Sequence, residues 1–184
     1  MSHAELHAIA EDLVTYMWDR DPLEATLMGF RDYDAGLADL SPAADAAFRE
    51  RRHELRKRLL DIGNDELEGQ DVLTKAVILA VLNNMDEFEI AGMDEFTVSD
   101  FPVSPSSGLL AYVRMIRITN ADEADAYVRR LQEFPRFLRQ AITKLEIGRK
   151  HGLTPVAHLV ENAAQQIDKY LQSTPDVFLL PAPA

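Results

Sequence analysis

The chain has 184 residues, of which 47% are hydrophobic and 27% charged, a balance typical of a folded globular protein and unlike that of a disordered or fibrous one. Its 31 acidic and 19 basic residues give a formal net charge of −12, which argues against nucleic acid or an anionic membrane surface as a partner. The absence of cysteine excludes disulfides, thiolate metal sites and cysteine nucleophiles.

The sequence shows no secretion or membrane signal. Its first residues lack a basic segment followed by a continuous apolar one, and no stretch reaches the roughly eighteen apolar residues that a membrane span needs. We therefore expect a cytoplasmic protein. A chain of this length can bury one sizeable core, so we expect a single helical domain over residues 1–184, either self-standing or the amino-terminal part of a longer protein.

Helical signals begin near the start of the chain. Apolar residues recur there at spacings of three and four, at Leu6, Ile9, Leu13 and Met17. This spacing places them on one face of an amphipathic helix over about 3–18.

A second, shorter helix is predicted to start at Pro22. Asp21 supplies an N-cap acceptor, proline is favoured at the first helical position, and Glu24 completes a capping box. Gly29 ends this helix after about two turns. A polar connector, FRDYDAGLADL, then leads to the next N-cap at Ser41.

Two longer helices are predicted next. The first runs from Ser41 to Gly63 with a narrow apolar seam, and the second spans about 71–91 and ends at Gly92. The apolar positions of the second form a broad stripe that consists of Leu73, Val77, Ala80, Val81, Met85 and Phe88. Such a stripe is typical of a central helix buried in the core.

The second half of the chain continues the helical pattern after one interruption. Serines and prolines over 96–108 predict an ordered, non-helical crossing loop. Helices are predicted over about 109–116, over 120–152 with a bend at Pro135, and over 155–172. Asn120 with Glu123 makes a capping box at the start of the second of these helices. The fold class is therefore all-α, with about seven helices in a compact bundle or layered array and no sheet.

The last residues form an apolar strip between prolines. Phe178, Leu179 and Leu180 stand where a solvated terminus is expected. One interpretation is that they fold back onto the core of this domain. The other is that they belong to an interface, either with a further domain or with a second copy of the chain.

Histidines suggest a metal site at one place only, and weakly. His3 and His7 stand one helical turn apart, a spacing that can chelate a metal ion. The zinc-protease pattern His-Glu-x-x-His is not met, because Glu5 is in the third position and the pair lies in a first turn expected to fray. We therefore predict no metal site and no catalytic or cofactor-binding residue, with His3 and His7 as weak metal candidates.

Three other patterns are interpreted as surface features. His53-Glu54 is followed by Lys57, a cation that cannot serve as the second zinc ligand, so this stretch is expected to be a solvated helix face. His158 and Glu161 are expected to form a surface pair. An acidic group is interpreted as a solvated helix end rather than a cation site, and comprises Asp86, Glu87, Glu89, Asp94 and Glu95.

The run DPLEATLMGFRDYDAGLADLSP, the run FPVSPSSG and residues 121–156 together resemble a bacterial family known as domain of unknown function 885. The stretch DPLEATLMGFRDYDAGLADLSP is similar to the family's Asp-Pro-x-x-Ala-Thr-x-x-Gly run, its Tyr-Asp and its Asp-x-Ser. The matching positions are Asp21, Pro22, Ala25, Thr26, Gly29, Arg31, Tyr33, Asp34 and Ser41. Downstream, FPVSPSSG is similar to the family's loop before a helix, and residues 121–156 are similar to its Tyr-x-x-Arg-Leu run and the proline and glycines after it.

The resemblance implies the helical amino-terminal region of a longer protein that is similar to zinc-dependent peptidases. In that family the zinc-binding motif lies downstream of everything matched here. No metal ligand or catalytic base is therefore carried over, and zinc is expected only in the downstream region. Because such hydrolysis needs the metal, its bound water and a carboxylate base together, we expect no activity from this chain alone.

The polar connector is interpreted as structural. Its polar residues are expected to satisfy one another and the nearby helix ends, and are Arg31, Asp32, Tyr33, Asp34 and Asp39. Phe30, Tyr33 and Leu37 are expected to anchor it on the core.

Two functions follow as hypotheses. The first is a non-catalytic helical region that shapes the substrate cleft or an interdomain interface of a metallopeptidase-like protein, with a downstream catalytic domain as its partner. The second is a stand-alone interaction or dimerisation module that uses the carboxyl-terminal strip and the crossing loop from Pro102 to Gly108.

Overall fold

The computed structural model describes residues 2–173 and is all-α, as predicted; the described residues contain no strand. Its α-helices are α1 (Ser2–Arg20), α2 (Pro22–Leu27), α3 (Pro42–Asp61), α4 (Gln70–Ile90), α5 (Met93–Phe96), α6 (Pro105–Tyr112), α7 (Ala121–Gln132), α8 (Phe134–Lys150) and α9 (Ala157–Gln172). Short 3-10 helices are η1 (Arg31–Tyr33), η2 (Asn64–Glu66) and η3 (Val113–Met115). None of the helices in this part of the chain has the length and apolar character needed to cross a membrane.

The helix start signals of the sequence are confirmed. The side chains of Asp21, Ser41 and Asn120 each accept a hydrogen bond from the backbone N–H three residues later, at 3.0, 3.2 and 3.0 Å. Gly92 follows α4 in the left-handed conformation, with a φ of +63°. Local backbone chemistry therefore sets the ends of these helices.

The structure differs from the prediction within the second half of the chain. The segment 96–108 is not wholly a loop, because α6 already begins at Pro105, where proline occupies the first helical position. One helical turn, α5, precedes this segment. The predicted helix over 120–152 is two helices, since α7 ends at Gln132 and α8 starts anew before Pro135.

The chain divides into two compact units, which are described separately. Unit 1 consists of the described residues of Met1–Arg20 and Ser41–Ala91, and unit 2 of those of Asp21–Leu40 and Gly92–Ala184. That residues 1–184 form a single domain stays a prediction.

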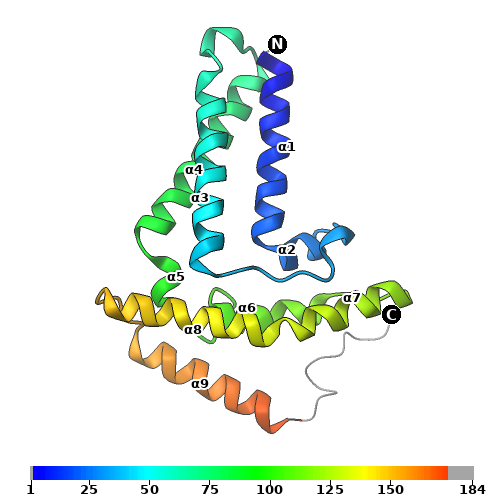
Figure 1. The fold of residues 1–184 in the computed structure, drawn as a ribbon, viewed down its shortest axis with the longest axis vertical. Helices are drawn as coiled ribbons and strands as arrows, with labels where there is room; N and C mark the ends of the chain where they lie inside the picture. Colours follow the sequence, from blue (N-terminus) through cyan, green and yellow to red (C-terminus); the bar gives the residue numbers. More distant parts are fainter. Residues whose placement is uncertain (1, 174–184) are drawn as a thin grey trace. The chain divides into compact units, whose positions relative to one another are not determined.

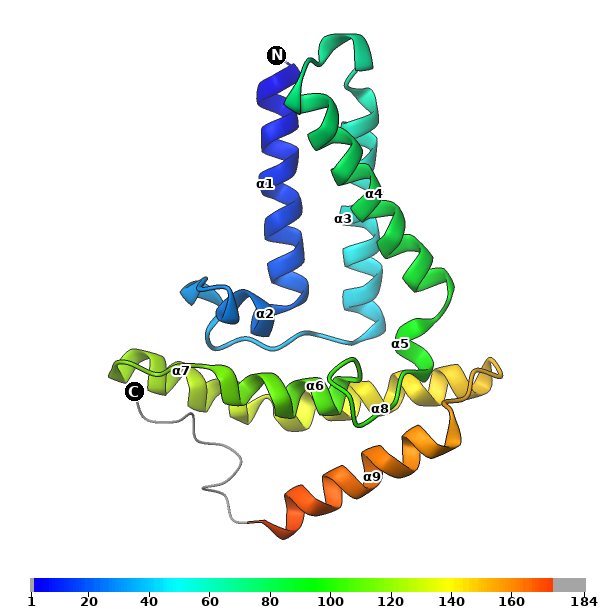
Figure 2. The ribbon, with the colours of Figure 1, turned by 180° about the vertical axis from the view of Figure 1, so that it is seen from behind.

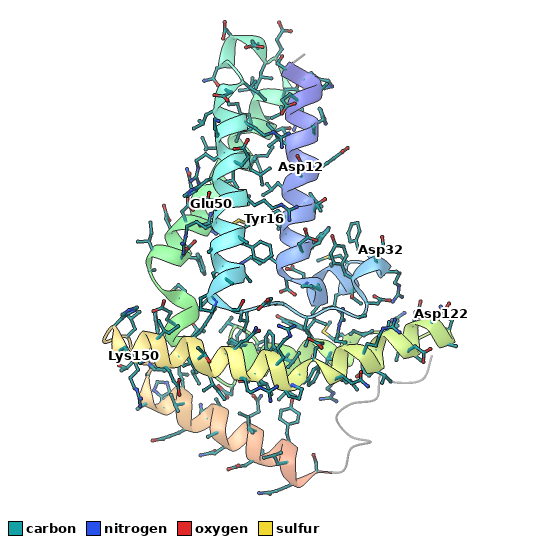
Figure 3. All side chains as sticks on the ribbon, in the orientation of Figure 1. Asp12, Tyr16, Asp32, Glu50, Asp122 and Lys150 are labelled. Carbon is teal, nitrogen blue, oxygen red and sulfur yellow. The ribbon has the colours of Figure 1, made fainter. Side chains whose placement is uncertain are left out.

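Unit 1 is built from α1, α3 and α4, which pack against one another (Figure 1, Figure 2). Its core consists of Leu6, Ile9, Leu13, Tyr16, Leu55, Leu59, Ile62, Leu67, Ile78 and Leu82. Tyr16 points from α1 toward α3 (Figure 3), where its ring meets that of Phe48 edge to face at 5.5 Å. The apolar face predicted for the first helix is thus confirmed as buried.

The face that α4 buries overlaps the predicted one only in part, at Val81 and Met85, which are partly buried against the core. Ile78 and Leu82 are the buried residues of this helix, whereas Leu73, Val77 and Phe88 are 58%, 62% and 55% exposed. Apolar residues surround much of α4, so their spacing alone does not select the arc that meets α1 and α3. The prediction that this helix lies buried at the centre is wrong.

Arginines of α3 form ion pairs with acidic side chains of α1 and α4 and so link the three helices of unit 1. Arg52 is 5% exposed and donates to Asp86 of α4 at 2.5 Å and to Glu89 of the same helix. Arg51 and Arg58 instead pair with acids of α1, so these arginines bridge helices rather than forming a ladder along α3. Of the predicted acidic group, Asp86 and Glu89 are therefore counter-ions of these arginines, whereas Glu87 is exposed as expected for a solvated helix end.

Unit 2 gathers α2 and α5–α9. The helices α7 and α8 follow one another almost in line, and α6 lies alongside α8 (Figure 1, Figure 2). Its core consists of Leu23, Leu37, Leu109, Val113, Ile116, Tyr127 and Phe137. Gly148 of α8 allows α5 to approach closely, because a methyl group at this position would overlap the carbonyl oxygen of Glu95.

The ion pairs of unit 1 predict a loss of stability in acid. Burial opposes ionisation of Asp86 and Glu89, but hydrogen bonds from arginines outweigh it and hold both pKa values below the ordinary 3.8 and 4.5. Their contribution is fully present above the unfolded pKa values and is lost as the pH falls through the lower folded ones. We expect the urea midpoint to fall steeply below about pH 4.5.

Urea unfolding between pH 7 and pH 3 measures this dependence. Glu89→Gln keeps a carbonyl oxygen for Arg52 but removes the titrating group, and should show a shallower slope. Glu50→Gln, at an exposed position of α3, should keep the original slope. Equal slopes for Glu89→Gln and the unaltered chain would contradict the assignment.

Candidate functional site

Residues 21–40, the first of the runs that resemble the family, begin with a capped helix. We call these residues the signature segment. Pro22, Ala25 and Thr26 are buried in α2, and Gly29 takes a φ of +95°, where the backbone N–H of Phe30 bonds to the carbonyl of Ala25 at 3.0 Å. Ser41, the next matching position, caps α3 in unit 1.

One arginine of α7 lies at the centre of the signature segment. Arg130 is completely buried, and its Nε donates to the carbonyl of Gly36 at 2.8 Å. Its Nη2 lies 2.6 Å from Thr26 Oγ1, 2.7 Å from the Tyr33 carbonyl and 3.2 Å from the Pro22 carbonyl. A single guanidinium therefore fastens both α2 and the loop after it to α7.

The burial of Arg130 has an electrostatic cost. Desolvation lowers its pKa well below the ordinary value of an arginine, to about 10, against the opposing influence of Asp34 and Asp21. The side chain is still charged at neutral pH. Among the described residues, neither Nη1 of Arg130 nor Oδ1 of Asp34 finds a hydrogen-bond partner, although both are buried. These two orphan atoms carry opposite charges.

Two residues of α8 hold the rest of the loop. Arg136 donates to the carbonyls of Leu37 and Ala38, each at 3.2 Å. Gln140 accepts from the backbone N–H of Leu40 at 3.1 Å and donates to Asp39 at 2.7 Å. The loop is thus bound mainly through its backbone, by side chains about a hundred residues later in the sequence.

The expected roles of the connector residues are met in part. Arg31 pairs with Asp34 at 3.3 Å, and Leu37 is buried. Phe30, in contrast, is 46% exposed and does not anchor the loop in the core. Most of the polar satisfaction comes from α7 and α8 and not from the connector itself, because the groups that need partners are its carbonyls.

The crossing loop is held by serines. Ser99, Ser104 and Ser107 are buried, and the carbonyl of Ser99 accepts from the hydroxyl of Ser104 at 2.8 Å and from that of Ser107 at 2.6 Å. Gln166 of α9 lies 2.8 Å from the Ser107 hydroxyl and donates to the carbonyl of Asp100. These hydroxyls are structural partners of backbone groups and are not aligned with a histidine base in the part of the chain that the structure describes.

Histidine and acid positions fall into two groups. His3 and His7 meet Asp71, the second residue of α4, and these three form the one set of three His, Cys, Asp or Glu side chains in residues 2–173 close enough to hold a metal ion. We call it the histidine cluster. His53, Glu54, His158 and Glu161 are exposed, while Asp94 pairs with Lys144 and Glu95 with His151.

Rows of apolar side chains are exposed to solvent on α4 and α9. The α4 stripe consists of Leu73, Val77, Ala80 and Phe88, all exposed on one side of that helix. The α9 stripe consists of Val156, Val160, Ile167 and Leu171, which are 55%, 40%, 38% and 78% exposed. Only Ala163 of α9 is fully buried. The strip formed by Phe178, Leu179 and Leu180 lies outside the described residues.

The hydrogen bonds between Arg130 and the signature segment predict that replacing this arginine destabilises the protein strongly. Arg130→Met strands several buried carbonyls, and we expect it to lower the free energy of unfolding by about 3–5 kcal/mol. Arg130→Lys should recover little, because an ammonium group cannot reach oxygens on both sides as the guanidinium does. Arg129→Met is the matched control at an exposed neighbouring position and should stay within about 0.5 kcal/mol.

Urea unfolding of the four proteins measures these differences. An Arg130→Met chain as stable as the Arg129→Met chain would show that the buried guanidinium does not hold the signature segment.

Comparison with known proteins gives one match. Residues 22–182 match a family described as "Bacterial protein of unknown function (DUF885)". No curated protein and no solved structure matches the chain. The match begins at Pro22, so it includes Arg130 and all of the signature segment except Asp21. The chain belongs to the DUF885 family of bacterial proteins.

Proposed function

We propose that this chain is a non-catalytic helical region of a metallopeptidase-like protein, and that it packs against the catalytic region through exposed apolar helix surfaces. Membership of the DUF885 family supports the proposal that the chain is one region of a longer protein of this family. The zinc of such a protein would be held by that other region. The residues present here do not fit a protease zinc centre, because His53-Glu54 is followed by Lys57 and both residues of the pair are exposed on α3.

The observation that carries the proposal is the α4 stripe. Its three large members are more than half exposed, although they follow the helical spacing of a buried face. Burying one large apolar side chain is worth about 1.5–3 kcal/mol, so a partner that covered Leu73, Val77 and Phe88 would gain several kcal/mol. Isolated exposed leucines are common, but a stripe along one side of a helix indicates an interaction surface.

The α9 stripe supports the same interpretation from unit 2. The apolar arc of this helix is wider than the part that its neighbours cover, since Ala163 is buried and Leu159 partly buried while the four residues of the α9 stripe are exposed. A helix surface of this kind suits a groove or a second helix in the partner. Residues at the edge of this interface would then line one wall of the substrate cleft.

The alternative is a stand-alone dimerisation module, in which a second copy covers these stripes or the carboxyl-terminal strip. A closed two-fold dimer would bring the same stripe of both copies together. Light scattering of the purified chain over a range of concentrations separates the two proposals, because only self-association makes the mass depend on concentration.

Polar substitutions in the α4 stripe test the role of this surface. In the isolated chain, Leu73→Gln with Val77→Gln should change the free energy of unfolding by no more than about 0.5 kcal/mol per site, since both side chains already face water. In a longer family protein that contains this region, the same pair should lower the melting temperature, because the surface is covered there. Leu60→Gln, at a leucine of α3 that is 57% exposed outside the stripe, is the matched control and should affect neither protein.

Two results would contradict the proposal. One is a dimer of the isolated chain that the double substitution converts to a monomer, which would favour the alternative. The other is hydrolysis of peptides by the isolated chain that a chelator abolishes.

A further inference from the structure

We propose that His3, His7 and Asp71 form a binding site for a transition-metal dication such as Zn²⁺ or Ni²⁺, which joins the start of α1 to the start of α4. This site belongs to unit 1 and does not depend on the proposed function. It uses no residue of the signature segment. Metal binding here would be structural, connecting parts of the chain that are 68 residues apart.

The two histidines are presented on one side of α1. Residues at positions i and i+4 of a helix are neighbours on its surface, and the two imidazole rings are in edge contact with their centroids 4.4 Å apart. The chain is helical from Ser2, so both histidines lie within α1. The hydroxyl of Ser2 donates to the carbonyl of Glu66 at 3.0 Å, which ties the first turn to η2.

Asp71 completes the group from the first turn of α4. Its Oδ2 lies 2.6 Å from Nδ1 of His3, and its Oδ1 lies 3.7 Å from Nε2 of His7. One possible ligand atom from each residue lies within 4.8 Å of the other two. A tetrahedral ion with bonds of about 2.0–2.1 Å needs its ligand atoms roughly 3.3–3.5 Å apart, which small rotations of these side chains supply.

The surrounding backbone is fixed while the ligand side chains can adjust. Leu6 and Ile9 are fully buried beside the two histidines, and Leu67 is buried just before α4. The side chains of His3 and His7 are 71% and 55% exposed, so they can turn toward an ion without repacking the core. Because the buried neighbours hold the backbone in place, metal binding would have to order only the ligand side chains.

The charge of Asp71 has no fixed counter-ion. Its side chain is only 17% exposed, and no lysine or arginine among residues 2–173 pairs with it. Lys75 stands one turn later on α4, where it would suit an i,i+4 pair, but its ammonium group donates to the Ile62 carbonyl and to Asn64. Arg58, the arginine near this end of α1, is occupied by Glu5 and Asp12. The carboxylate therefore faces two imidazoles.

The donor set selects the class of metal. Imidazole nitrogens favour zinc, nickel, cobalt and copper, whereas magnesium and calcium prefer oxygen ligands alone. Three protein ligands leave at least one position for water. Because the unfolded chain does not preform this arrangement, metal that binds the folded chain must raise its stability.

Calorimetric titration of the untagged full chain with ZnCl₂ and NiCl₂, after treatment with a chelator, tests the site. We expect one metal ion per chain and a rise in melting temperature that EDTA reverses. His3→Gln, His7→Gln and Asp71→Asn should each weaken binding by more than about tenfold, since even changes around metal ligands commonly cost 10–100-fold. Magnesium at the same concentration should have no effect.

Matched controls distinguish this site from general histidine binding. His53→Gln and His158→Gln remove exposed histidines outside the cluster and should leave affinity and stoichiometry unchanged. Absence of saturable binding would show that His3 and Asp71 form an ion pair only. Unchanged affinity in both His3→Gln and His7→Gln would place the metal elsewhere, and both variants change exposed side chains, so their folding is not in question.

Discussion

The arrangement of unit 2 depends on the burial of one charged side chain. Among residues 2–173, Arg130 is the largest side chain without solvent access, and its guanidinium joins α7 to the loop that follows α2. Its partners are three carbonyls and one hydroxyl, so the positive charge is solvated by the backbone of the signature segment and not by a paired carboxylate. This explains why an elaborate loop is needed: a chain that turns repeatedly can aim several carbonyl dipoles at one point.

Unit 1 also contains a buried arginine, but there the hydrogen-bond partners are side chains. Arg52 is nearly as buried as Arg130, but it is surrounded by Asp86, Glu89 and the hydroxyl of Tyr16. Burial lowers the pKa of Arg52, yet these hydrogen bonds outweigh it and the net shift is upward, opposite to that of Arg130. The two arginines show how the sign of a pKa shift depends on whether a buried cation is hydrogen-bonded to carboxylates or to backbone carbonyls and a hydroxyl.

The sequence predicts the features that local chemistry controls. Asp21, Ser41 and Asn120 cap helices because each oxygen needs only a backbone N–H three residues away. Arg130 lies in the run that resembles the family, but its role depends on carbonyls 94 to 108 residues away, which no local pattern contains. Asp71 is separated from His3 by the whole of α3, and the covered arc of α4 depends on where α1 and α3 lie. The spacing of apolar residues predicts that a helix forms, but contacts with other helices decide which of its faces is buried.

The central claim is that the signature segment is a structural element fastened by Arg130. A double-mutant cycle between Arg130→Met and Thr26→Val measures it most directly, because their contact joins α7 to α2 at 2.6 Å in a buried setting. If the guanidinium and the hydroxyl act together, the coupling free energy from urea unfolding should be about 1–3 kcal/mol. Additive effects of the two substitutions, with a coupling near zero, would contradict the account.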